Sequence, residues 1–505
     1  MELFQHSLLL LLLPLLAAAA AAAWSRGRGR GRRFHPVAGT VFHQILHFDR
    51  IYHYQTELSR RHKSFRMLDP FHSEVYTTDP AVVEHILRTN FHNYGKGWYS
   101  YETTRDLLGD GIFVVDGNRW RHQRKLASHE FSTRTLRDYS GAVFKKNAAK
   151  LVRAVRQAAS SQQVMDIQDW FMKSTMDSIF EVAFGMELNC LQGSNQERNR
   201  EFVSAFDESS ALLMWRFVNP AWKLMRFLNI GSEAKLRQKI RIVDDYVYKL
   251  IEAKIQQISS QQDLSPVKKE DILSRFLVES EKDPKNMNHQ YLRDIILNFV
   301  IAGKDTTAGT LSWFFYMLCK HSSVQEKVAQ EVAEAVGASG NASFEEFTAS
   351  ITEEALEKMQ YLHAALTETL RLYPAVPLDS KVCFSDDTLP DGFHVRRGEV
   401  VTYQPYVMGR MKYLWGEDAE AFRPERWLNA NGAFCPESPF KFTAFQAGPR
   451  VCLGKEFAYR QMKIFAAVLL RFFMFKLSDE GKPINYRTML TLHIDQGLHL
   501  QAVQR

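Results

Sequence analysis

The spacing of apolar residues along this chain predicts helices over most of its length. Residues 141–257 repeat apolar positions at helical spacing, which indicates successive amphipathic helices with a polar break near Gln192 to Arg200. The polar stretch from Ser259 to Glu270 is expected to be a loop. Two segments among the short helices nearer the N-terminus, Phe65 to Leu68 and Ser73 to Thr77, are predicted to be strands.

The segment from Tyr291 to His321 predicts one long helix, which would span roughly 45 Å. Its centre, Ile301 to Thr307, is unusual for a helix. Gly303 lowers helix stability there, and threonine hydroxyls can bond back to backbone carbonyls and open the helix. This local cost suggests a functional role, although an ordinary buried helix with satisfied hydroxyls could carry the same residues.

Cys452 lies in a turn-rich stretch, Phe445 to Gly454, where two glycines and a proline fix the backbone. An amphipathic helix from Lys455 to Phe473 is expected to follow. A cysteine on a rigid loop, near a helix N-terminus and beside Arg450, is expected to exist as a thiolate. Thiolates act as redox groups, nucleophiles or metal ligands. The lack of a second cysteine at C-x-x-C spacing weakens a zinc or dithiol interpretation, and a buried structural cysteine is the other alternative.

Composition, net charge and cysteine content restrict the possible fold classes, partners and compartments. The 505 residues are 45% hydrophobic and 12% aromatic, which supports a large core, and length alone suggests two or more domains. The net charge is +7, and five of the positive charges come from Arg26, Arg28, Arg30, Arg32 and Arg33. The rest of the chain has no cationic excess suited to nucleic acid. An odd number of scattered cysteines is no disulfide framework and fits a reducing compartment: Cys190, Cys319, Cys383, Cys435 and Cys452.

The N-terminus contains an apolar run from Leu8 to Trp24, at the short end for a membrane-spanning helix. A cleavable signal peptide is the competing interpretation, because small residues precede Trp24. No Lys or Arg precedes the run, however, and the arginine cluster that follows it favours a cytosolic position. The Gly-Arg alternation could instead bind RNA, but an anchor flank explains it more simply. We therefore predict a signal-anchor.

These features divide the chain into three parts. Residues 1–24 are predicted to be the anchor, and residues 25–40 a basic, Pro/Gly-containing linker with a hinge at Phe34 to Gly39. Residues 41–505 form the globular body.

The pattern Phe-x-x-Gly-x-Arg-x-Cys-x-Gly at residues 445–454 resembles the haem-binding loop of the cytochrome P-450 superfamily. The resemblance implies that the Cys452 sulfur is the axial ligand of haem b iron and that Phe445 belongs to the cofactor-binding loop. It covers about residues 41–505 and implies a single, mainly α domain with small β-sheets, instead of the several domains suggested by length.

Other motifs extend this resemblance. Trp120 and Arg124 share a helix face and would donate hydrogen bonds to a haem propionate, a role that the resemblance also suggests for Arg450 and Lys381. Taken alone, a Trp and an Arg one helical turn apart are more often a surface cation–π pair.

Two further motifs have implied roles around the cofactor. Ala302 and Gly303 would leave room for O2, while Thr306 and Asp305 would organise waters that deliver protons. A buried network of Glu368, Arg371 and Arg426 would hold the cysteine loop in place.

The resemblance implies a monooxygenase. Electrons from NADPH would arrive through a separate flavoprotein reductase, because the chain shows no G-x-G-x-x-G dinucleotide fingerprint. Three stretches, at 111–117, 302–310 and 446–457, look like the plant fatty-acid ω-hydroxylase clan. They imply a long-chain fatty acid substrate, met at the endoplasmic reticulum membrane by a body in the cytosol. Candidate channel walls, each also compatible with plain core packing, are Phe113, Val114, Ile301, Ala302, Val376, Leu378 and Met489.

Two other functions stay open at this point. The substrate could be another lipophile, such as a terpenoid or sterol. Alternatively, the protein could be a haem-thiolate sensor or electron carrier without turnover, although the Asp305–Thr306 pair and the anchor speak against that class.

Overall fold

The computed structural model describes residues 33–69, 72–132, 134–192, 197–260, 271–282, 287–337 and 342–505. Its α-helices are α2 Val41–Leu46, α3 Ile51–Arg61, α4 Pro80–Glu84, α5 Gly97–Leu108, α6 Gly117–Ser132, α7 Arg134–Ser160, α8 Ile167–Phe184, α9 Glu197–Arg216, α10 Trp222–Leu228, α11 Gly231–Ser260, α12 Ile272–Lys282, α13 His289–Val300, α14 Thr306–Lys320, α15 Ser322–Val336, α16 Phe344–Ser350, α17 Glu353–Lys358, α18 Gln360–Leu372, α19 Pro405–Met408, α20 Lys412–Trp415 and α21 Lys455–Phe472. Its strands are β1 Val37–Thr40, β2 Ser64–Leu68, β3 Ser73–Thr77, β4 Tyr94–Gly95, β5 Met165–Asp166, β6 Asp379–Cys383, β7 Asp387–Thr388, β8 His394–Val395, β9 Val400–Tyr403, β10 Phe473–Leu477, β11 Tyr486–Arg487, β12 His493–Ile494 and β13 His499–Gln504.

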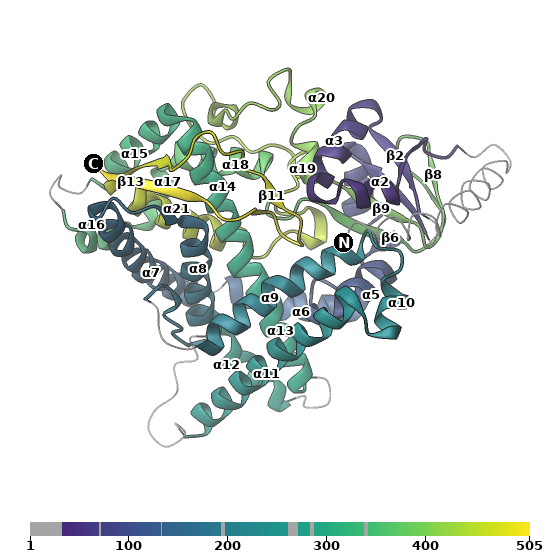
Figure 1. The fold of residues 1–505 in the computed structure, drawn as a ribbon, viewed down its shortest axis with the longest axis horizontal. Helices are drawn as coiled ribbons and strands as arrows, with labels where there is room; N and C mark the ends of the chain where they lie inside the picture. Colours follow the sequence, from purple (N-terminus) through teal and green to yellow (C-terminus); the bar gives the residue numbers. More distant parts are fainter. Residues whose placement is uncertain are drawn as a thin grey trace.

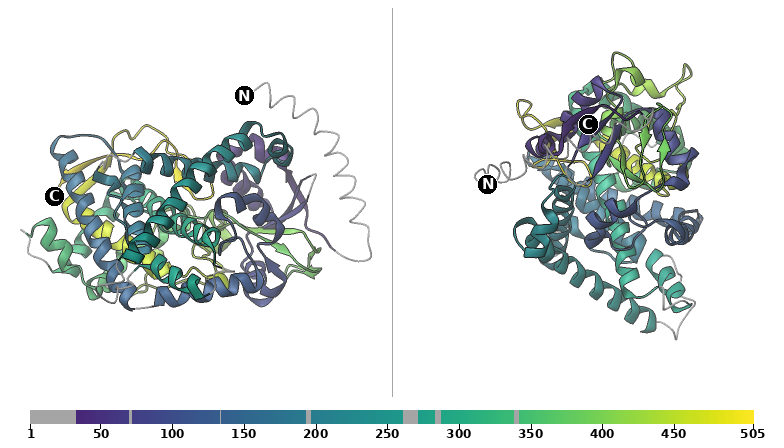
Figure 2. Two further views of the ribbon diagram at one scale, coloured as in Figure 1. Left: turned by 90° about the horizontal axis from the view of Figure 1, so that it is seen from below. Right: turned by 90° about the vertical axis from the view of Figure 1, so that its right-hand side faces the viewer.

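The main sheet lies at one end of the molecule together with α2 and α3, and longer helices make up the other end (Figure 1). Figure 1 shows β2, β6 and β9 at one end and α7, α15 and α21 at the other, and the view from below in Figure 2 keeps the same separation. Within the described residues the main sheet has the strand order β1-β2-β3-β9-β6-β4. The predicted mainly helical fold with small sheets is confirmed.

A nearly continuous helix crosses the middle of the fold (Figure 1). It begins after Asn288, whose side chain accepts a hydrogen bond from the backbone N–H of Tyr291, and it ends at Lys320. A π-helical turn, η5 Ile301–Asp305, separates α13 from α14 where the sequence predicts a disturbance. Helices α8, α18 and α21 pack around this axis. The axis therefore places the irregular turn deep in the core.

The expected linker differs from the structure. Val37–Thr40 form β1, which pairs in parallel with β2. His35 is buried and its Nε2 lies 3.0 Å from a carboxylate oxygen of Asp391, so the predicted hinge is packed onto the body. The sheet therefore begins before residue 41, because an edge strand gains stability by pairing its backbone groups.

The predicted anchor, residues 1–24, lies outside the described residues. In the part of the chain that the structure describes, none of the helices combines the length and the apolar character needed to cross a bilayer.

Candidate active site

The cysteine loop is held by its own backbone and by one close contact. A short 3-10 turn, Gly448–Arg450, precedes Cys452, and the Cys452 N–H donates to the Phe445 carbonyl over 2.8 Å. Gly448 has φ +64°, and a Cβ there would lie 1.9 Å from the Leu87 carbonyl oxygen. Only glycine fits this turn without a shift of the backbone. Helix α21 starts at Lys455, as predicted.

Cys452 is an exposed residue, but neighbouring protein atoms surround much of its thiol. This desolvation raises the pKa of the Cys452 thiol, while the Gly454 N–H, Arg124 and Lys455 act to lower it. The expectation that the loop alone produces a thiolate is therefore wrong, because desolvation outweighs the nearby positive groups. Ionisation of this sulfur calls for a bound cation such as a metal.

Arg450 offers an unused donor beside the cysteine. One of its terminal nitrogens donates to Asp116 over 2.5 Å and to the Val115 carbonyl over 3.0 Å. Its guanidinium lies 4.5 Å from the centroid of a Trp120 ring. The Nε atom of Arg450 is buried and has no hydrogen-bond partner within the described residues. An orphaned buried donor of this kind indicates a missing acceptor.

The predicted Trp120–Arg124 pair is present on α6, with the Arg124 guanidinium 5.9 Å from the Trp120 ring centroid. Among the described residues neither side chain has a hydrogen-bonded carboxylate. Burial lowers the pKa of Arg124, and Cys452 acts in the opposite direction. Arg124 is therefore a half-buried cation next to the cysteine, placed to accept an anionic partner.

Lys381 lies on β6, where its ammonium group bonds to the neighbouring Asp379. Lys96 also donates to Asp379, over 2.5 Å, so two lysines share one carboxylate. Burial, with the nearby charges of Lys96 and Arg450, lowers the pKa of Lys381 to about 7 although Asp379 acts to raise it. The sequence did not show that Lys381 is already paired. The surplus positive charge nevertheless suits a second anion.

Together these groups fit an iron porphyrin. Cys452 offers a thiol on an exposed residue. For the acidic side groups of the porphyrin, Arg124 and the Lys381 pair provide excess positive charge, and Arg450 provides the unpartnered Nε. Trp120 supplies a ring and an indole N–H without an acceptor among the described residues. The donor set thus matches a dianionic cofactor bound through a soft metal ligand.

The π-helical turn presents a small, accessible face. Ala302, Gly303 and Thr306 are half-buried, whereas their neighbours Ile301 and Asp305 are buried. The Thr306 hydroxyl donates to the Ala302 carbonyl over 2.6 Å, which confirms the predicted back-bonding. Such π-helical turns frequently occur at functional sites.

Asp305 is fully buried and is held differently from the expectation. Its Oδ1 lies 2.8 Å from Lys304 Nζ, and its Oδ2 accepts from the Thr491 hydroxyl at 3.4 Å. Lys304 Nζ also lies 2.5 Å from Asp207 Oδ1 on α9. Asp305 is thus part of an ion cluster as well as a neighbour of Thr306, a contact that the sequence could not reveal.

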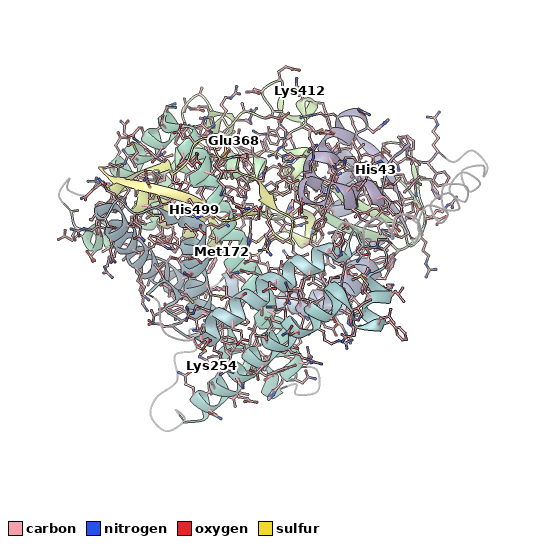
Figure 3. All side chains as sticks on the ribbon, viewed as in Figure 1. His43, Met172, Lys254, Glu368, Lys412 and His499 are labelled. Carbon is pink, nitrogen blue, oxygen red and sulfur yellow. The ribbon has the colours of Figure 1, made fainter. Side chains whose placement is uncertain are left out.

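The predicted Glu368 network is present, with Glu368 and Arg371 fully buried and Arg426 partly buried. Figure 3 labels Glu368 in the region of α18. Arg371 makes two bonds to the Glu368 carboxylate, of 2.7 and 2.8 Å, and Arg426 lies 3.5 Å from it. Sequence reasoning missed Trp427, whose indole N–H donates to Glu368 over 2.8 Å. Its position directly after Arg426 was the only available signal.

The candidate channel residues divide into two groups. Phe113 is 42% exposed, and its N–H donates over 3.4 Å to Asn298 on α13, one turn before the π-helical turn. Ala302, Val376 and Leu378 are half-buried. By contrast, buried side chains that pack in the core are Val114, Ile301 and Met489.

Comparison with known proteins settles the family. Residues 30–500 match the cytochrome P-450 family profile. The chain belongs to the cytochrome P-450 family. Family membership implies haem as the cofactor of this cytochrome P-450 and monooxygenation as its class of reaction.

Plant cytochromes P-450 are among the proteins similar to this chain. Cytochrome P-450 704C1 of Pinus taeda is 50% identical over 483 residues, covering 93% of this chain and 92% of that protein. Cytochrome P-450 704B1 of Arabidopsis thaliana is 43% identical over 497 residues, covering 93% and 94%. Cytochrome P-450 94A2 of Vicia sativa is 37% identical over 483 residues, covering 93% and 90%. The similarity therefore extends over nearly the whole of each cytochrome P-450.

Proposed function

We propose that this cytochrome P-450 hydroxylates long-chain fatty acids at or near the methyl end. Cys452 would ligate the iron of haem b, which when bound supplies the activation of O2. The observation that carries this assignment is the accessible Cys452 thiol beside the buried, unpartnered Nε of Arg450. A thiol beside an arginine with an unpartnered Nε matches two features of the cofactor, its metal and its carboxylates.

Three groups would bind the propionates of the cofactor. Arg450 Nε and Arg124 have donors without carboxylate partners among the described residues, and Lys381 belongs to a pair with one excess positive charge. Trp120 would add its indole N–H. Charge-assisted bonds of this kind are roughly twice as strong as neutral ones, so they would fix the orientation of the cofactor.

Thr306 would hold a proton-carrying water near the reacting oxygen. Its hydroxyl donates to the Ala302 carbonyl, so its lone pairs remain available to accept from water. Asp305 would maintain the transfer of protons to this water. One oxygen atom of O2 becomes water with two electrons from NADPH and two protons, and the other enters a C–H bond of the substrate.

The fatty-acid assignment is supported by three sequence stretches and by one exposed aromatic ring. The stretches at 111–117, 302–310 and 446–457 look like the plant fatty-acid ω-hydroxylase clan. Phe113, on the first of these, exposes an apolar ring beside α13. An apolar passage from this loop toward Ala302 would admit an acyl chain and guide its methyl end to the iron.

Electrons would come from a separate NADPH-dependent flavoprotein reductase. Residues 1–24 would anchor the protein in the endoplasmic reticulum membrane, where it would meet both the reductase and membrane lipids. This arrangement would place the catalytic body in the cytosol.

The test is reconstitution with a plant reductase, NADPH and a panel of C12 to C22 fatty acids, with a terpenoid and a sterol alongside. Products hydroxylated at or near the methyl end are expected from the fatty acids. Haem-loaded enzyme that oxidises only the terpenoid or sterol would overturn the substrate assignment. Loaded enzyme without any turnover would favour a sensor or carrier.

The haem ligand has its own test. Cys452→Ser is expected to abolish the red-shifted spectrum of the reduced carbon monoxide complex. Cys435→Ser, at the other exposed cysteine, is the matched control and should retain it. Survival of the spectrum in Cys452→Ser would contradict the whole scheme.

A further inference from the structure

We propose that Asp207 of α9 is a positioning residue that controls Asp305 through Lys304. The three side chains form a chain of two contacts that joins α9 to the π-helical turn. Lys304 Nζ lies 2.5 Å from Asp207 Oδ1 and 2.8 Å from Asp305 Oδ1. The inference rests on the proposed role of Asp305 in proton supply, and it adds the group that determines the position and charge of that carboxylate.

The three members differ in their access to water. The side chains of Lys304 and Asp305 are 0% exposed, whereas that of Asp207 is 27% exposed. Burial acts to lower the pKa of Lys304, but Asp207 and Asp305 raise it above its usual value. Lys304 therefore stays protonated between two carboxylates, and the cluster carries one negative charge. Solvent reaches this buried cluster at Asp207.

The second oxygen of Asp305 is held from another direction. The Thr491 hydroxyl donates to Asp305 Oδ2 over 3.4 Å, and Thr491 also lies 3.2 Å from His493 Nε2. Burial lowers the pKa of His493, so this histidine is neutral near pH 7 and adds no compensating charge. Asp305 is thus clamped at both oxygens, and Lys304 is its only cationic partner among the described residues.

Sharing the lysine leaves net negative charge in the cluster next to Thr306. Because Lys304 is divided between Asp207 and Asp305, one positive charge faces two carboxylates, and the uncompensated charge attracts water to this position. In Asp207→Asn, Lys304 would bind Asp305 alone and neutralise it. The Lys304–Asp305 pair would then carry no net charge and attract water and protons less strongly, so proton supply to the Thr306 position would slow.

The expected result in Asp207→Asn is a larger share of NADPH electrons released as hydrogen peroxide. We expect the ratio of peroxide to NADPH to rise severalfold, and by less than in Asp305→Asn, because Asp207→Asn leaves the Asp305 carboxylate in place. The solvent deuterium isotope effect on NADPH-dependent water or product formation should also increase, because proton transfer becomes more limiting. Asp207→Glu retains the carboxylate and should restore much of the coupling.

Glu208→Gln is the matched control. Glu208 is the next residue on α9, and its carboxylate lies 2.8 Å from both Lys239 and Lys235 on α11, away from Lys304. The Glu208→Gln variant loses an ion pair of α9 without changing the partners of Lys304. It therefore measures the effect of weakening the packing of α9 alone. Its haem content, peroxide ratio and isotope effect should match those of the unsubstituted protein.

Asp305→Asn and Thr306→Ala show whether the proposed proton route exists. All variants are first checked for the carbon monoxide spectrum and are then compared by NADPH, O2 and peroxide balances, so the outcome does not depend on fatty acids being the substrate. Uncoupling in Asp305→Asn, Thr306→Ala and Asp207→Asn, with none in Glu208→Gln, supports the inference. If Asp207→Asn behaves like Glu208→Gln while Asp305→Asn and Thr306→Ala uncouple, the inference is overturned and the proton route stands. Coupling that is unchanged in Asp305→Asn and Thr306→Ala overturns both.

Discussion

At Lys381 a buried ammonium group shares the single carboxylate of Asp379 with Lys96. Two cations against one anion leave a positive charge inside the fold, and burial lowers the pKa of Lys381 to about 7. This charge makes the site unusually sensitive to the cofactor. An anionic propionate nearby would raise the pKa of Lys381, so binding of haem would take up a proton.

Haem affinity is therefore expected to fall as pH rises above about 7. One proton taken up on binding reduces affinity by at most about tenfold per pH unit, from about pH 7 up to the raised pKa of the bound state. Transfer of haem to a scavenging apoprotein, timed between pH 6.5 and 9, measures this slope. Lys381→Arg keeps its charge throughout and should flatten the profile. Equal slopes in the two proteins would contradict the role of Lys381.

Trp427 shows a different kind of contribution from one side chain. Its indole N–H donates to the buried Glu368 carboxylate, so Trp427→Phe would leave a charged acceptor with one donor fewer. We expect a loss of about 1–3 kcal/mol in the free energy of unfolding. Urea titrations followed by fluorescence and by the carbon monoxide spectrum measure it. Trp415→Phe, which removes a donor to the neutral Met408 carbonyl, is the control and should cost less.

At the scale of elements, the cysteine loop depends on a neighbour far away in the sequence. Gly448 approaches the backbone at Leu87 so closely that a Cβ would collide with the carbonyl oxygen, and its φ is +64°. Gly448→Ala should therefore shift the loop and lower haem content severalfold. Gly432 has φ +74° with open space around it, so Gly432→Ala carries the backbone strain without the collision. Absorbance of haem per protein distinguishes the two, and equal haem contents would contradict the proposed contact.

The elements that the sequence predicts best are those with local signals. The helix after the cysteine loop, the disturbed centre of the long helix and the Glu368–Arg371 pair all depend on residues a few positions apart. The Lys304–Asp207 contact could not be predicted, because it joins residues 97 positions apart and a lone lysine before Asp305 carries no directional signal. Likewise, the Asp379 carboxylate that binds Lys381 is two residues away, but only the strand geometry brings it inward.

At the scale of the whole molecule, the structure begins the sheet at Val37 and packs His35 against Asp391. The body therefore extends closer to the proposed anchor than its sequence suggested. Composition did not indicate the strand at Val37–Thr40, because four residues are too few to distinguish a strand from a linker. Only the pairing of β1 with β2 identifies these residues as a strand.

Removal of residues 1–24 tests the anchor. The shortened chain keeps β1 and His35 and should retain the carbon monoxide spectrum after expression in yeast. It should also move from the membrane pellet toward the supernatant after centrifugation of a cell lysate. The full chain provides the control. Retention of the shortened chain entirely in the pellet would show that other surfaces bind the membrane.

The Glu368 network also affects how freely this protein can vary. Arg371 donates to the carbonyl oxygens of Gly409, Ala419 and Ala421, and Arg426 donates to those of Trp415 and Asp418. Because these arginines bind main-chain oxygens, they fix the backbone path of the segment. This fixation does not depend on most of the side chains in the segment.

Exposed positions within this segment, such as Lys412 and Glu417, are therefore expected to tolerate substitution during evolution. Gly409 is constrained, because a Cβ there would lie 2.0 Å from the Arg371 carbonyl oxygen. A saturation library across residues 409–421, sorted by haem content, should accept almost any residue at positions 412 and 417 and reject nearly all at position 409. The segment would then be a place where sequences diverge while the fold and its cofactor stay the same.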